Sequence, residues 1–201
     1  GGATYKINGR NYFYANASYS TRAPYFEDIF VSPRTRNSAI EDAKNEKIAS
    51  IESGYVLNTP KVKARLSGYL TKFNDLTKTM TFYHDEYRNN VNYTLTDIDK
   101  IHFGGELGVE AKVYKGLTAT LAAALGRYFY TSRQKATVTV DNSSDVLSSN
   151  EVIFSKNFQL GGTPQTAATI GLNYRSPKYW FLSVNVNYFD DMYLDFNPIR
   201  R

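Results

Sequence analysis

The chain has 201 residues, a formal net charge of +5 and no cysteine, and 15% of its residues are aromatic. The absence of cysteine excludes a disulfide framework and thiolate metal ligation, and no apolar run approaches the roughly 18 residues of a membrane-spanning helix. Lysine and arginine are scattered among acidic residues and form no stripe with interleaved aromatics, so we expect no nucleic-acid partner.

Eight β-strands are predicted, counting a partial first one, because apolar and polar residues alternate with a period of two. In chain order they are Thr4–Ile7, Asn11–Ser20, Ile48–Leu57, Lys61–Phe73, Ile101–Tyr114, Leu117–Tyr130, Gln165–Tyr174 and Tyr179–Phe189. The clearest of them, Ile101–Tyr114, is far longer than the usual strand of about 5–6 residues. It is long enough to cross a bilayer in a barrel, for which about 9–11 residues suffice. The sequence therefore predicts an all-β fold, an antiparallel up-and-down transmembrane β-barrel segment.

Four short turns alternate with three long polar segments along the chain. The turns are Asn8-Gly9, Asn58–Pro60, Lys115-Gly116 and Arg175–Lys178, and the long segments are Thr21–Glu46, Asp75–Asp99 and Ser132–Gly162. Because each connection reverses the strand direction, we expect all the turns at one end of the sheet and the long segments at the other. Outer-membrane barrels have this asymmetry, with short periplasmic turns and long extracellular loops.

The alternation also predicts which side chains share a face. We expect lipid contact from Leu107, Val109, Leu121, Leu125, Leu182 and Val184, and lumen contact from Glu106, Glu110, Lys112 and Asn185. Arg127 is an exception because it falls on the apolar face. It lies toward the loop end of its strand, where an interfacial charge costs only about 0–1 kcal/mol.

Short motifs spread over nearly the whole chain resemble the barrels of TonB-dependent outer-membrane receptors of Bacteroidetes type. They include Tyr19-Ser20-Thr21-Arg22-Ala23-Pro24, Lys63-Ala64-Arg65-Leu66-Ser67-Gly68-Tyr69, Gly161-Gly162-Thr163-Pro164-Gln165 and Asn185-Val186-Asn187-Tyr188-Phe189-Asp190. The resemblance implies a 22-stranded barrel in the bacterial outer membrane, plugged by an N-terminal domain, that takes up a nutrient such as a siderophore or a sugar with energy passed through TonB.

We therefore expect residues 1–201 to be a single barrel fragment without a plug domain or the last barrel strands. The expected partners are outer-membrane lipid, the rest of the barrel and its plug, TonB through an absent N-terminal region, and an unidentified small ligand. Two alternatives stay open from the sequence. One is a soluble β-rich binding or adhesion module, and the other is an independent eight-stranded outer-membrane barrel.

We expect no enzymatic activity, cofactor or metal site. His84 and His102 are the only histidines, and His84 lacks the convergent ligands that a metal requires. The best ligand-binding candidates combine aromatic rings with cations, which suit stacking and charge-assisted hydrogen bonds. They lie in the first two long segments and are Tyr25, Phe26, Arg34, Arg36, Tyr83, Tyr87 and Arg88. Their alternative role is packing within loops and aromatic girdles.

Overall fold

The computed structural model describes residues 1–31, 39–40, 43–141, 143 and 145–198. Its strands are β1 (Gly2–Asn8), β2 (Asn11–Arg22), β3 (Glu46–Asn58), β4 (Val62–His84), β5 (Asn89–Tyr114), β6 (Leu117–Tyr130), β7 (Gln134–Val140), β8 (Val146–Ile153), β9 (Thr166–Arg175) and β10 (Phe181–Asp190), and a short helix, α1 (Phe26–Ile29), follows β2.

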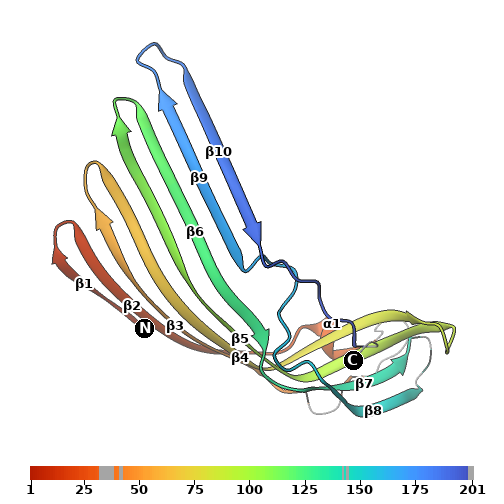
Figure 1. Cartoon of the computed structure of the whole chain (residues 1–201). Coiled ribbons are helices and arrows are strands. Elements are labelled where there is room, and N and C mark those ends of the chain that lie inside the picture. Colours follow the sequence, from red (N-terminus) through yellow and green to blue (C-terminus); the bar gives the residue numbers. More distant parts are fainter. Residues whose placement is uncertain (32–38, 41–42, 142, 144, 199–201) are drawn as a thin grey trace.

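The strands form one antiparallel sheet, in which eight follow the path β1-β2-β3-β4-β5-β6-β9-β10 (Figure 1). The other two lie off this path, β7 pairing with β5 and β8 with β7. The predicted all-β, antiparallel, up-and-down fold is confirmed. Within the described residues the sheet is open, because β1 and β10 end the path without pairing.

The four short turns lie together at one end of the sheet, and β7, β8 and α1 lie at the other, as Figure 1 shows. In the first turn, Asn8 Oδ1 accepts the backbone N–H groups of Arg10 at 2.9 Å and Asn11 at 3.1 Å. Gly116 has a φ of +76°, a left-handed conformation that glycine adopts at little cost. The predicted separation of short turns from long segments is therefore confirmed.

Two of the three predicted loops are wrong for much of their length. β4 has 23 residues and β5 has 26, so the pair continues as a hairpin through most of Asp75–Asp99. The third segment, Ser132–Gly162, contains the hairpin of β7 and β8. β7 pairs with β5 between Val91 and Thr96, which adds strands beyond the predicted eight.

A pair of β-bulges explains why this extension looks like a loop in the sequence. The register between β4 and β5 shifts between Phe73 and Leu76 and again between Leu76 and Lys78. Asp75 and Asp97 have φ values of +59° and +54° there. One inserted residue in each strand reverses the alternation, so the apolar residues beyond the bulges project to the opposite side of the sheet.

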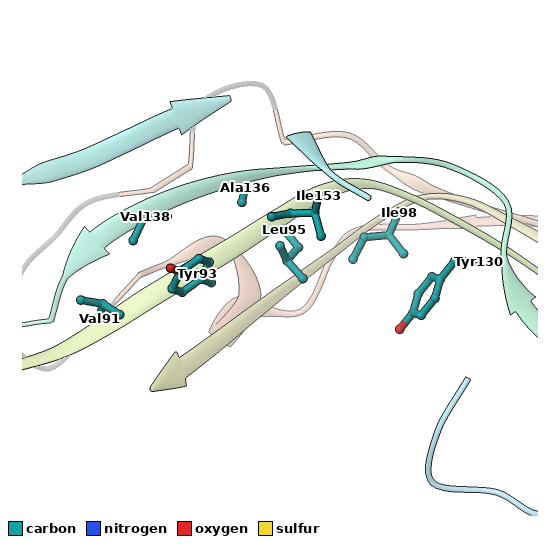
Figure 2. Packing of buried hydrophobic residues seen from close by; sticks show 8 residues of the cluster. All are labelled: Val91, Tyr93, Leu95, Ile98, Tyr130, Ala136, Val138 and Ile153. Atoms are coloured by element: carbon teal, nitrogen blue, oxygen red, sulfur yellow. The ribbon is translucent and has the colours of Figure 1, made fainter. Parts of the chain in front are cut away.

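The extension has its own hydrophobic core, at the end of the sheet away from the short turns. Figure 2 shows its eight buried members, which are Val91, Tyr93, Leu95, Ile98, Tyr130, Ala136, Val138 and Ile153. Tyr130 comes from the end of β6, and Phe158, Leu160 and Phe196 also pack against the cluster. The segments after β8 and β10 thus cover the extension of β4 and β5.

Cross-strand pairing gives the rest of the sheet two chemically different faces. The apolar face carries the paired rows Ala64, Val109, Leu121, Ile170, Val186 and Leu66, Leu107, Ala123, Ala168, Tyr188. The polar face carries rows such as Lys63, Glu110, Thr120, Gly171, Asn185. Directly paired residues share a face, so the register confirms the segregation predicted for the six apolar and four polar residues.

Helix α1 lies along the edge of β4 that no described strand covers. β3 pairs with β4 only as far as the Lys47–Asn74 pair. Beyond it, Asp28 Oδ1 accepts the backbone N–H of Thr79 at 2.8 Å, and the Asp28 carbonyl accepts the Thr79 hydroxyl at 3.1 Å. These bonds satisfy part of an otherwise open strand edge. Within the described residues, no helix has the length and apolarity needed to cross a membrane.

Candidate ligand pocket

A cavity of about 760 Å³ lies on the polar face, at the end of the sheet away from the short turns. The elements around it are the ends of β2 and β6, helix α1, the start of β3, and β4 and β5 near their bulges. Its lining includes Arg22, Tyr25, Asp28, Glu46, Lys78, Lys100, His102, Tyr128, Tyr130 and Asp195. This mixture of charged and aromatic groups makes the cavity the strongest candidate site in the described chain.

One wall is an ion pair that positions an aromatic ring. Arg22 and Glu46 are paired residues of β2 and β3, and the Arg22 Nε–H donates to the Glu46 carboxylate. The Glu46 side chain is only 2% exposed, so the arginine compensates a buried negative charge. A second Arg22 nitrogen donates to the Tyr25 hydroxyl at 2.9 Å, and the guanidinium carbon lies 4.7 Å from the Tyr25 ring centroid.

A second wall contains a histidine without a hydrogen-bond partner. The His102 ring lies between Phe73 and Tyr128, with ring centroids at 4.9 Å and 4.7 Å. Its Nε2 is buried and bonds to none of the described groups. The Tyr128 hydroxyl is 2.6 Å from that of Tyr69, which fixes the tyrosine beside the imidazole. Buried polar atoms usually have a hydrogen-bond partner, so the unpaired Nε2 marks His102 as a candidate contact for a polar ligand in this cavity.

Lys100 supplies a cation next to this histidine. Its ammonium lies 4.8 Å from the Phe73 ring centroid and forms no ion pair within the described residues. Three other charged groups of the lining are already engaged by protein groups: Lys78 pairs with Asp195 at 3.5 Å, and Asp28 accepts the Thr79 N–H. Burial raises the pKa of the Asp28 carboxyl, and the Thr79 bond opposes this effect only in part.

The arrangement suits noncovalent recognition of a polar ligand. Tyrosine rings offer stacking surface, and Lys100 and His102 offer charge-assisted and neutral hydrogen bonds. Among residues 1–31, 39–40, 43–141, 143 and 145–198, no three histidine, aspartate or glutamate side chains are grouped so that they could hold a metal ion.

Of the predicted site residues that the structure describes, only Tyr25 lines this pocket. Phe26 is exposed and stacks on Phe30 at 4.3 Å. Arg34 and Arg36 lie outside the described residues.

The remaining three predicted residues, Tyr83, Tyr87 and Arg88, lie at the tip of the β4–β5 hairpin, away from the pocket lining. Both tyrosines are exposed, and the Tyr87 ring lies 4.7 Å from that of His84. The hairpin tip therefore carries exposed aromatic and cationic side chains separate from the pocket. Their role in ligand binding stays a prediction.

Sequence reasoning missed Glu46, Lys100 and His102 because each lies within or at the end of a strand. A usable signal was present, since all three occupy polar-face positions near the long-segment end. All three are polar-face residues at or near the ends of the predicted strands farthest from the short turns, and the predicted loops alone do not contain this set.

The comparisons with known proteins agree with this geometry. The family model described as "TonB dependent receptor-like, beta-barrel" matches residues 1–199. Among solved structures, the chain is similar to one titled "Copper transporter OprC", with a TM-score of 0.66 and 19% identity over 92% of this chain. The chain spans 25% of that transporter, and a likeness at this identity concerns the fold alone. No curated protein matches the chain.

Proposed function

Because this chain belongs to the TonB-dependent receptor β-barrel family, we propose that it forms part of the barrel wall of an outer-membrane receptor for nutrient uptake. The open sheet supports this proposal, since β1 and β10 present unpaired edges to which further strands can add. An independent closed barrel of eight strands does not fit, because the first and last strands of the path do not pair.

The observation that carries the proposal is the division of one sheet into a broad exposed apolar face and a polar face with a pocket. Large apolar side chains are exposed in row after row, among them Leu66, Leu121, Ile170, Val186 and Tyr188. In water such a large apolar surface would favour aggregation, whereas lipid acyl chains provide an apolar environment for it. The apolar face therefore contacts outer-membrane lipid, and the polar face lines the lumen.

The pocket then lies on the lumen side, at the extracellular mouth of the barrel. A nutrient entering there meets Lys100, His102 and the surrounding tyrosines before it reaches the plug. The exposed tip at Tyr83, Tyr87 and Arg88 provides an earlier contact. The ligand is a small polar nutrient of the siderophore or sugar type, and the role is transport without catalysis. The plug and TonB are the partners that complete the cycle.

Detergent dependence tests the membrane assignment. The receptor that contains this chain is extracted from cell envelopes with and without a nonionic detergent, and its monodispersity is measured by size-exclusion chromatography. We expect a monodisperse species only with detergent, because the apolar face needs a hydrocarbon substitute. A monodisperse receptor in plain buffer would contradict the proposal and favour a soluble β-rich module.

Growth of a receptor-deletion strain on a panel of limiting iron sources and sugars identifies the nutrient, and complementation then tests the pocket. His102→Ala and Lys100→Met should raise the nutrient concentration needed for half-maximal growth, because they remove polar contacts from the lumen wall. Lys112→Gln is the control, because Lys112 lies on the same face but pairs with Thr118, beside the short turn between β5 and β6. Pocket variants that grow like this control would exclude the pocket from the ligand route.

A further inference from the structure

Two cations lie on the apolar face where its hydrophobic rows end. Lys72 of β4 is paired with Ala49 and Ile101, and Arg127 of β6 is paired with Phe103. Both residues are exposed, and neither forms an ion pair within the described residues. A charge on a lipid-facing surface is expensive unless it lies at the interface, so these two residues mark the outer boundary of the hydrocarbon layer.

Aromatic and aliphatic side chains separate the two cations. Phe103 and Phe129 pack edge to face, with ring centroids 6.3 Å apart, and Phe103 is 39% exposed. The rows toward the short turns continue with Leu66, Leu107 and Leu121. A molecule bound here would therefore meet positive charge at one end and apolar surface at the other.

The charges beyond this boundary are already satisfied by one another. Lys47 pairs with Asp75 at 2.7 Å, and Asp97 pairs with Lys44 at 2.6 Å and with Lys135 at 3.0 Å. These bonds form at the two bulges, which follow directly after Lys72 and lie beyond Phe103, the partner of Arg127. The aspartates of the bulges are thus engaged by other lysines, and Lys72 and Arg127 are left for an external anion.

We propose that Lys72 and Arg127 bind the phosphate group of a phosphorylated outer-leaflet lipid whose acyl chains lie over Phe103 and the apolar rows below it. The guanidinium binds phosphate oxygens in a bidentate manner, and the flexible lysine stem allows its ammonium to reach the same headgroup. A free phosphate ion would use the two cations only, so the adjacent exposed apolar surface selects the lipid. This inference rests on the membrane assignment of the proposed function.

The test measures lipid binding to the receptor in an uncharged detergent, by native mass spectrometry of its lipid adducts. The probe is dihexanoyl phosphatidic acid, compared with phosphatidylcholine of the same chain length and with inorganic phosphate as a competitor. Each interfacial cation should strengthen binding of the anionic lipid about fivefold, the equivalent of about 1 kcal/mol. The Lys72→Gln/Arg127→Gln variant should therefore bind phosphatidic acid about 25-fold more weakly than the wild type.

The control variant, Lys112→Gln/Lys115→Gln, removes the same charge from near the opposite end of the sheet and should bind like the wild type. Lys72→Arg keeps the charge and should also bind normally. Equal affinity for the two lipids, equal loss in test and control variants, or full displacement by equimolar inorganic phosphate would overturn the inference. If the receptor is monodisperse without detergent, the proposed function is overturned as well. If the receptor needs detergent and gives one of the contrary lipid-binding results above, only the lipid site is overturned.

Discussion

Leu121→Arg, compared with Thr120→Arg, separates the two faces of the sheet by a single residue. Leu121 lies on the apolar face between Val109 and Ile170, and Thr120 lies on the polar face between Glu110 and Gly171. Leu121 is four residues from the start of β6. At about 3.4 Å per residue and a tilt of about 45°, this places it about 10 Å above the short turns, close to the middle of a layer about 25 Å thick.

The expected costs differ because the surroundings differ. An arginine at the bilayer midplane of a barrel costs about 2–4 kcal/mol, so Leu121→Arg should lower the free energy of unfolding by this amount. At position 120 the new guanidinium faces the lumen. There it lies beside the Glu110 carboxylate and over Gly171, which has no side chain of its own. We expect a change of less than about 1 kcal/mol, the usual effect of an exposed substitution.

The assay is equilibrium unfolding of the receptor by guanidinium chloride in phospholipid vesicles, with the midpoint and slope fitted separately. A shift of the midpoint at constant slope reports stability. Equal destabilisation by the two variants would refute the assignment of the apolar face to lipid. A larger loss of unfolding free energy for Thr120→Arg than for Leu121→Arg would show that the polar face, not the apolar face, contacts lipid.

Three further predictions follow from other parts of the sheet. Gly104→Ala should destabilise the receptor by about 1–3 kcal/mol in the same unfolding assay, because a Cβ there would collide with the Leu125 carbonyl and lie 2.8 Å from the Tyr69 hydroxyl; Gly108→Ala, where no atom lies within 4 Å, should be nearly neutral. Bonds from Lys44 and then Lys135 lower the pKa of Asp97 below the unfolded value of about 3.9, so this stabilisation is present above that pH and is lost as the pH falls toward the folded pKa. Hydrogen exchange corrected for intrinsic rates should therefore show β7 opening more readily at pH 3 than at pH 6, and Asp97→Asn should abolish the difference. Replacing Tyr83, Tyr87 and Arg88 at the hairpin tip by alanine should leave barrel assembly intact and slow ligand uptake by growing cells. Uptake at the parental rate would show that these three residues do not contact the ligand.

The sequence by itself determined the eight strands of the main path up to the bulges, the four short turns and the two faces of the sheet. Period-two alternation is a local property, because neighbouring residues of a strand must point to opposite sides. The pattern from Ile101 to Tyr114 therefore predicts the correct faces without knowledge of any partner strand. Short turns such as Lys115-Gly116 are equally local, since two residues and one left-handed glycine are enough to reverse the chain.

Only the tertiary structure decided what happens beyond Asp75 and Asp97. The two bulges oppose each other across β4 and β5, and their combined effect is to move the apolar side chains to the other side of the sheet. No single strand contains this information, because a bulge is defined by the register with its partner. The pocket has the same origin: Glu46, Lys100 and Tyr25 come from three separate parts of the chain, and pairing and packing across the sheet bring them together.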